Sequence, residues 1–332
     1  MRTYKLNQKK PYISFVVVGR NDDYGYKFLD RFQNFLDNLI YLCEKYRLPS
    51  ELIIVEWNPP KEKPRLYNAL NINKNRKFLN IRFIEVPHRL HQKFENSDKL
   101  PLFEYVGKNV GIRRANGEFV LATNPDIIFN AELIEFLSKQ QLEDDCFYRI
   151  ARYDLRDDIP KGLKKEKLLT FCKKKYFCYN GVYFAFIKPK NVSELYLFFK
   201  LLVRKIARSI LMFLFRKKYF YLWIHGGCPG DFILMKKENW FKIRGFSESG
   251  LRNGIDGLAT IMAHFAGFKM VILKDPLRIY HQNHARADEG KPKFTLKEYL
   301  NKIRKMQKKN SLVHENDLSW GLRGINLKEK RV

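Results

Sequence analysis

The chain has 332 residues, of which 45% are hydrophobic and 15% aromatic. This composition excludes a disordered or fibrous protein, and the length is sufficient for one large core or two modest ones. The formal net charge of +28 indicates an anionic partner, whether nucleic acid, lipid headgroups or a phosphorylated substrate. The five cysteines are an odd number without metal-site spacing, which indicates reduced thiols in a reducing compartment.

The predicted elements alternate between strands and helices along the first part of the chain. The apolar run at residues 12–18 predicts a strand, and it is too short to be the apolar core of a signal peptide. Apolar residues recur with helical period at residues 27–46. Further strands are predicted at residues 51–55, 81–86 and 119–123. This alternation predicts a mostly parallel α/β sheet in a single domain over residues 1–332, and we expect a cytoplasmic protein.

Residues 157–223 are predicted to form a basic insertion in this domain. Within it, Lys200, Arg204 and Arg208 recur every four residues, and leucine, isoleucine and phenylalanine side chains occupy the other side of the helix. Each basic residue would oppose insertion across a bilayer by roughly 2.5–3.5 kcal/mol, more than the apolar residues return. We therefore expect a helix that lies on an anionic membrane surface, with an ordinary surface helix as the alternative.

The segment 109–129, NVGIRRANGEFVLATNPDIIF, predicts a helix, a glycine turn, a buried strand and a polar turn where that strand ends. Open α/β sheets bind ligands at the carboxyl ends of their strands. Asp126 lies in that polar turn, and the arginine pair Arg113 and Arg114 precedes the strand. This pattern suggests a site for a phosphate and its counter-cation, and a solvated acidic turn is the alternative.

These motifs resemble those of the GT-A glycosyltransferases, in particular the inverting family 2 group. That family often has N-x-G-x-x-x-A-x-G, then a strand, then D-x-D. Here Asn109 begins the motif, Asn124 stands at the first acidic position and Asp126 at the second. Residues 245–248, GFSE, are similar to the G-F-D-E turn of the family. Asp256 stands at the position of the family's catalytic aspartate. The resemblance implies a doubly wound GT-A fold with residues 157–223 as a basic helical insertion.

The resemblance also implies an activity, namely transfer of a sugar from a nucleotide-diphosphate donor to a hydroxyl of a glycan or lipid-linked acceptor, with inversion. Asp256 would be the general base, and Asp126 and His281 would bind a divalent cation, Mn²⁺ or Mg²⁺. Because Asn124 replaces the first acid of D-x-D, cation affinity should fall. The implied donor-binding residues are Arg20, Asn21, Asp22, Glu56, Asn109, Arg113, Arg114, Asn124 and Asp231.

Two other functions are compatible with the residues. Asn124, and Ile255 where the family usually has glutamate, suggest a non-catalytic or nucleotidyl-transferring relative of the same fold. The charge and the interleaved aromatic residues suggest a nucleic-acid-binding protein, but we find no known binding module and expect no nucleic-acid partner. Residues 291–332 form a lysine-rich tail in which a helix is expected. The favoured hypothesis is a glycosyltransferase of polysaccharide biosynthesis, peripheral at the cytoplasmic face of a membrane.

Overall fold

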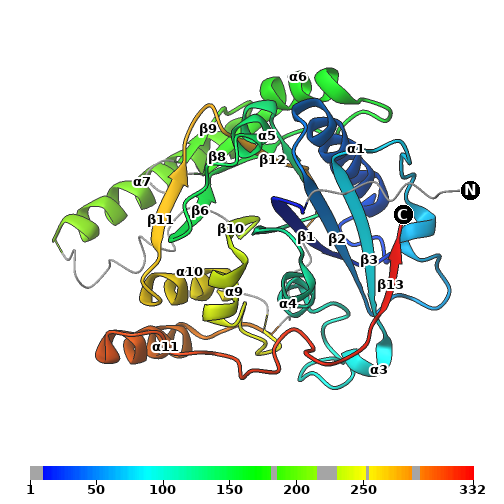
Figure 1. Cartoon of the computed structure of the whole chain (residues 1–332). Helices are drawn as coiled ribbons and strands as arrows, with labels where there is room; N and C mark the ends of the chain where they lie inside the picture. The colour runs from blue at the N-terminus through cyan, green and yellow to red at the C-terminus, as the bar shows by residue number, and fades with distance from the viewer. Residues whose placement is uncertain (1–9, 181–184, 215–229, 252–253, 286–291) are drawn as a thin grey trace, which may run out of the picture.

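The computed structural model describes residues 10–180, 185–214, 230–251, 254–285 and 292–332. An eight-stranded sheet of order β11-β6-β10-β4-β1-β2-β3-β13 forms the centre of the molecule (Figure 1). Its strands are β1 (Ile13–Gly19), β2 (Ser50–Trp57), β3 (Leu79–Val86), β4 (Phe119–Thr123), β6 (Cys146–Ile150), β10 (Phe232–Lys236), β11 (Lys269–Leu273) and β13 (Lys328–Arg331). Only β10 and β13 run antiparallel to their neighbours, so the expected mostly parallel α/β sheet is confirmed.

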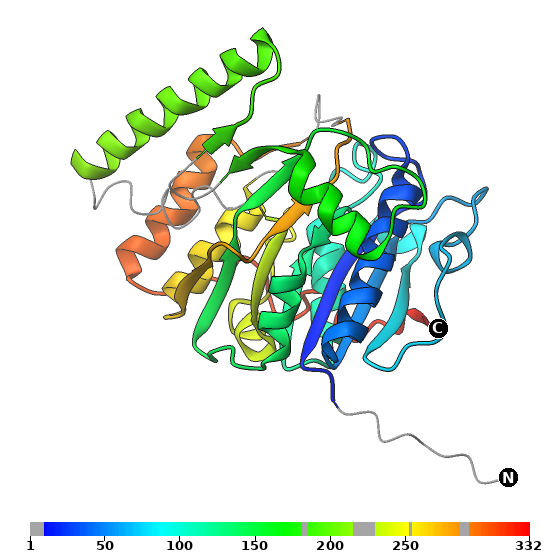
Figure 2. The same ribbon diagram turned by 90° about the horizontal axis from the view of Figure 1, so that it is seen from above.

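Helices cover both faces of this sheet (Figures 1 and 2). One face packs against α1 (Phe28–Tyr46) and α5 (Ala131–Ser138), and the other against α4 (Glu104–Arg114), α9 (Lys237–Ile243), α10 (Ile255–Phe265) and α11 (Leu296–Lys309). Two short helices, α2 (Leu66–Ala69) and α3 (His88–His91), lie in the connections. The sequence of β1 is continuously apolar because the strand is buried on both faces. Phe15 and Val17 pack in one core, and Val16 and Val18 pack in the other.

A second sheet continues from the carboxyl ends of β4 and β6. Its order is β5-β12-β7-β8-β9. The strands are β5 (Ile127–Phe129), β7 (Arg152–Leu155), β8 (Tyr176–Asn180), β9 (Ala185–Ile187) and β12 (Ile279–His281). Because only three residues separate β4 from β5 and one separates β6 from β7, this sheet lies directly at the carboxyl edge of the main sheet.

The predicted insertion at residues 157–223 contains more than basic helices. It includes α6 (Lys165–Lys175) and α7 (Val192–Leu214), but also the two strands β8 and β9 that extend the second sheet. Residues 215–229, most of α7's connection to β10, lie outside the described residues. Among the residues that the structure does describe, no helix is both long and apolar enough to cross a bilayer.

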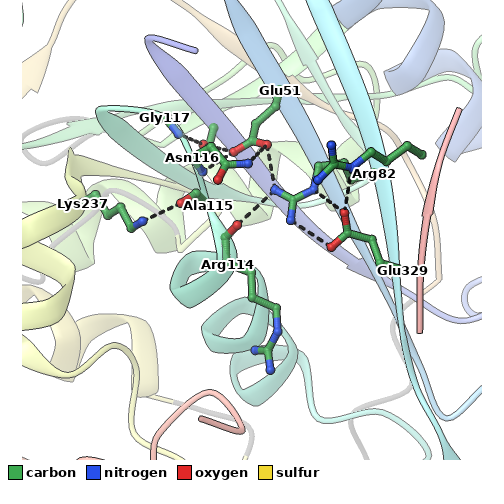
Figure 3. A network of polar contacts seen from close by, with 10 residues as sticks. Glu51, Arg82, Arg114, Ala115, Asn116, Gly117, Lys237 and Glu329 are labelled. Atoms are coloured by element: carbon green, nitrogen blue, oxygen red, sulfur yellow. Dashed lines mark hydrogen bonds and ion pairs between the residues drawn. The ribbon is translucent and has the colours of Figure 1, made fainter. Parts of the chain in front are cut away.

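The C-terminal tail contains the expected helix and one strand that was not predicted. Helix α11 begins with a capping box in which Thr295 and Glu298 exchange hydrogen bonds. Strand β13 then pairs with the edge strand β3, and Arg82 on β3 donates two hydrogen bonds to Glu329 and one to Glu51 (Figure 3). This ion-pair network stabilises the tail against the amino-terminal half of the sheet.

Candidate active site

A cavity lies where β1 and β4 end, and we call it the carboxyl-edge cavity. Its polar lining comes from several segments, namely Arg20, Asp22, Arg31, Glu104, Asn124 and Asp126. Its apolar lining includes Leu102, Phe103, Leu251 and Ile255. Ligands of open α/β sheets bind at this edge, so the cavity is the candidate active site.

Three side chains form a candidate metal site, and one of them, Asp126, lines the carboxyl-edge cavity. Asp126 Oδ2 lies 3.2 Å from His284 Nε2 and 3.7 Å from His281 Nε2, and one ligand atom from each residue lies within 4.8 Å of the others. Asp126 Oδ1 is buried and has no hydrogen-bond partner among the described residues. A carboxylate and two imidazoles with an unpartnered oxygen are a suitable ligand set for a divalent cation.

The register of the second sheet brings these residues together. His281 on β12 pairs with Ile127 on β5, and Asp126 directly precedes Ile127. On its other side His281 pairs with Asp154 on β7, and His281 Nδ1 lies 3.2 Å from Asp154 Oδ1. A carboxylate behind a histidine orients the ring and leaves its second nitrogen for a metal ion.

The surroundings keep Asp126 ionised. Burial opposes its ionisation, but the positive fields of His281, His284 and Arg31 lower the pKa of Asp126 well below its ordinary range. Arg31 on α1 also donates to the backbone carbonyls of Tyr24 and Gly25, so it connects the loop after β1 to this anionic site.

Asn124, at the first acidic position of the D-x-D motif, has a different environment. Its Oδ1 accepts from Lys108 Nζ at 2.7 Å, and its Nδ2 donates to Asp231 Oδ1 at 2.7 Å. Lys108 is almost fully buried, and its ammonium also donates to Glu104 at 2.7 Å. Asparagine therefore bridges a buried cation and a buried anion, whereas an aspartate at this position would face the carboxylate of Asp231.

Arg152 connects Asp231 to the candidate metal site. Its guanidinium lies 2.5 Å from Asp231 Oδ2 and 2.9 Å from Asp154 Oδ1. Burial disfavours the charged guanidinium, but Asp231 and Asp154 outweigh it and raise the pKa of Arg152. The result is a continuous polar network from Lys108 to Asp126. Arg152 and Asp154 were not predicted from the sequence, although their alternate positions in a short strand indicate a shared face.

The residues expected to bind the nucleoside divide into two groups. Arg20 and Asp22 line the cavity and form an ion pair at 2.7 Å. Asn21 and Glu56 do not line it: Asn21 Nδ2 donates to the Pro64 carbonyl, and Glu56 Oε1 accepts from the Leu66 backbone N–H at 2.9 Å. Burial raises the pKa of Glu56 to about 7. The structure therefore gives Glu56 a local role at the start of α2.

Asn109 does not reach the cavity either. It is fully buried on α4, and its amide exchanges hydrogen bonds with the backbone of Phe246 while also donating to Glu248 at 2.8 Å. The N-x-G and G-F-S-E motifs are thus in direct contact, and Asn109 fastens the 245–248 turn to α4. Ser247 in that turn lines the cavity, so Asn109 supports the site from behind.

The structure contradicts the expectation that Arg113 and Arg114 meet the phosphates. Helix α4 begins at the cavity with Glu104 and runs towards the amino edge of the sheet, so its last residue, Arg114, lies about 15 Å away along the helix axis. There Arg114 donates to the carbonyls of Gly321 and Leu322, and its own carbonyl accepts from Arg82 (Figure 3). Arg113 similarly donates to carbonyls of the C-terminal tail.

Asp256 lies beside the cavity in the first turn of α10. The preceding residue, Ile255, lines the cavity. Gly230 packs so closely on Asp256 that a Cβ at Gly230 would lie 2.7 Å from its carboxylate. Asp231 follows Gly230, so Asp256 stands next to the Asp231 end of the polar network.

No protein-family model matches the chain, and no curated protein sequence matches it. Among similar solved structures, S. aureus TarS 1-349 in complex with UDP-GlcNAc has 13% identity and a TM-score of 0.49, over 91% of this chain and 68% of that one. A second structure of TarS 1-349 has 14% identity and a TM-score of 0.43, over 81% of this chain and 60% of that one. GalNAc-T7 with UDP, GalNAc and Mn²⁺ has 13% identity and a TM-score of 0.45, over 94% of this chain and 53% of that one. Matches this distant do not assign an activity.

Proposed function

We propose that the protein is a glycosyltransferase that transfers a sugar from a nucleotide-diphosphate donor to a hydroxyl of a glycan or lipid-linked acceptor. The observation that supports this proposal best is the group Asp126, His281 and His284, in which Asp126 lines the carboxyl-edge cavity and has one carboxylate oxygen without a partner among the described residues. Similar structures contain UDP-GlcNAc in one case and UDP with Mn²⁺ in another. A cation held at this edge would neutralise the diphosphate that leaves with the nucleotide.

The mixed oxygen and nitrogen ligands favour Mn²⁺ over Mg²⁺, because Mg²⁺ prefers oxygen ligands alone. Asp126, His281 and His284 would hold the cation, and Asp154 would orient His281. Asn124 is bound to Lys108 and Asp231, so we assign it to the network behind the cation. Arg20 and Asp22 would bind the nucleoside part of the donor at the end of β1.

We propose Asp256 as the general base of an inverting transfer. Its carboxylate would take the proton of the acceptor hydroxyl while that oxygen bonds to the anomeric carbon and the bond to the diphosphate breaks. The support is its place in the first turn of α10, directly after the cavity-lining Ile255, and its contact with Gly230. Asp231, which directly follows Gly230, would bind sugar hydroxyls.

The first experiment is a thermal-shift screen of uridine, guanosine, cytidine and thymidine diphosphate sugars, with and without Mn²⁺. We expect one donor to raise the melting temperature in the presence of Mn²⁺ and to be slowly hydrolysed. Binding without any turnover would support a non-catalytic relative instead.

The second experiment uses the substitution Asp256→Asn. Turnover should be lost while the affinity for the donor is retained, because the base acts only in the chemical step. Asp145→Asn is the matched control, since Asp145 is an exposed acid paired with Lys269 at the start of β6. Retained turnover in Asp256→Asn would exclude Asp256 as the base.

We further propose that the reaction takes place at the cytoplasmic face of a membrane, as a step of polysaccharide biosynthesis. The net charge of +28 supports an anionic surface as the partner. Measured localisation in fractionated cells tests this proposal, and recovery of the protein away from the membrane fraction would contradict it.

A further inference from the structure

Helix α7 has an exposed apolar stripe along its whole length. The stripe consists of Val192, Tyr196, Phe199, Val203, Ile206, Ile210 and Phe213, each of which is more than half exposed. These residues alternate at spacings of four and three, so they lie on one face of the helix. An exposed apolar surface of this extent on a folded domain indicates an interaction site.

The helix is attached to the domain at its amino-terminal end. Glu194 forms an ion pair with Arg156 at 2.8 Å, and the Glu194 backbone N–H donates to Asn191 Oδ1 at 2.9 Å. Helix α7 also packs on β9, the last strand of the second sheet. Figure 2 shows α7 at the periphery of the molecule, with its long axis beside the main body. The stripe therefore belongs to a helix that is packed through another of its faces.

The charge of this region favours an anionic surface as the occupant. The sequence of α7 contains four basic residues and a single acid, Glu194, which Arg156 already neutralises. Two exposed lysines, Lys188 and Lys190, lie just before the helix. Pairing of two copies through α7 would bring like charges together on chains that each have a net charge of +28. Anionic lipid headgroups would instead attract the positive charge of this region.

We propose that α7 docks on the surface of an anionic bilayer, with its apolar stripe among the acyl chains and its basic residues at the headgroups. This arrangement is that of an interfacial amphipathic helix. The second sheet connects α7 to the site, because β9, β8 and β7 lie side by side and β7 contributes Arg152 and Asp154. Docking would also present the cavity to a lipid-linked acceptor, a consequence that rests on the proposed function.

The test measures co-sedimentation of the whole protein with vesicles, without any nucleotide-sugar. One set contains phosphatidylcholine alone and the other a mixture with phosphatidylglycerol. We expect binding to the anionic vesicles only, weakened by added salt. Replacing three residues of the stripe together, Phe199→Gln, Val203→Gln and Ile206→Gln, should reduce the partition coefficient about tenfold or more. Glutamine keeps both the helix propensity and the charge of α7.

The matched control replaces two exposed apolar residues of the C-terminal tail, Leu318→Gln and Ile325→Gln, and should bind as the unaltered protein does. Equal binding by the triple variant, or equal binding of the unaltered protein to both kinds of vesicle, would overturn the proposal. A lipid-free dimer that the triple variant abolishes, seen by light scattering, would assign the stripe to a second copy and also overturn it. Donor binding by the triple variant in the absence of vesicles should be unchanged, which separates docking from the proposed reaction.

Discussion

The side-chain amide of Asn124 donates a 2.7 Å hydrogen bond to the carboxylate of Asp231, at a position where the D-x-D motif has an acid. The same amide accepts from the buried ammonium of Lys108. Position 124 therefore belongs to a charge-balanced network that continues through Arg152 and Asp154 to the candidate metal site. Asparagine replaces the acid of the motif because its amide can both accept from Lys108 and donate to Asp231.

Restoring the acid should destabilise the protein. In Asn124→Asp two carboxylates would face each other, and the ammonium of Lys108 would compensate only in part. We expect the free energy of unfolding at neutral pH to fall by roughly 1–3 kcal/mol. The loss should shrink at acidic pH, because the introduced carboxyl group, once protonated, can again donate to Asp231. Urea denaturation measures both effects. Asn301→Asp on the exposed side of α11 is the control, and equal stability of the two variants would contradict the network.

Removal of a candidate ligand should weaken cation binding. His284→Ala, whose side chain faces Asp126 at 3.2 Å, is expected to lower the affinity for Mn²⁺ about tenfold or more, as measured by titration calorimetry. His314→Ala, at an exposed histidine that bonds the Lys242 carbonyl, should leave the affinity unchanged. Affinity should also fall at acidic pH, because imidazole must be neutral to bind a metal. An unchanged affinity for Mn²⁺ in His284→Ala would show that His284 is not a metal ligand.

Glu56 should make stability decrease as pH rises. Burial raises its pKa from 4.5 to about 7, so between these values the folded protein retains a proton that the unfolded chain has lost. The stabilisation is complete below the unfolded value and is lost as pH rises through the folded value. Glu56→Gln keeps the acceptor for the Leu66 N–H and carries no charge. We expect it to be more stable than the unaltered protein by roughly 1–3 kcal/mol at about pH 8, and not at about pH 4.

Thermal unfolding of both proteins across this pH range measures the difference. Glu62→Gln, at an exposed glutamate, provides the control and should show no such pH dependence. A difference between Glu56→Gln and the unaltered protein that does not change with pH would show that folding does not shift the pKa of Glu56.

Arg114 should contribute to stability and not to donor binding. Its guanidinium donates to the carbonyls of Gly321, Leu322 and Ile325, and these bonds hold the tail against α4. We expect Arg114→Ala to lower the free energy of unfolding by roughly 1–3 kcal/mol and to leave the affinity for Mn²⁺ and for the donor unchanged. Urea denaturation and calorimetry provide the two measurements. A selective loss of donor affinity would show that Arg114 does contribute to donor binding.

Much of the fold could be predicted from local pattern. The strands β1, β2, β3 and β4 and the helix α1 lie within a few residues of their predicted positions, because buried strands and amphipathic helices have distinct apolar periods. Strand β13 could not be predicted this way. Its residues, KEKR, are polar and exposed, and the strand exists because β3 presents a free edge and Arg82 binds Glu329.

The candidate site was predictable only in part. Asp126 and His281 were named from the sequence and lie together in the structure, and their role as metal ligands stays a prediction. Arg152 and Asp154 were missed, because a four-residue strand has too little pattern to show which edge of which sheet it joins. The pair Arg113 and Arg114 precedes β4, the strand that ends at the polar turn, yet the direction of α4 takes both arginines to the opposite edge.

Periodicity and turn residues were therefore enough to establish an α/β sheet, its strand positions and the acidic turn at its carboxyl edge, since these depend on interactions between near neighbours in the chain. The composition of the site depended on contacts between residues distant in sequence. The register of β12 between β5 and β7 brings His281 to Asp126 and Asp154, and the bridge from Lys108 through Asn124 to Asp231 joins three separate elements. Such contacts follow from how strands pair and helices pack, which no local pattern of residues encodes.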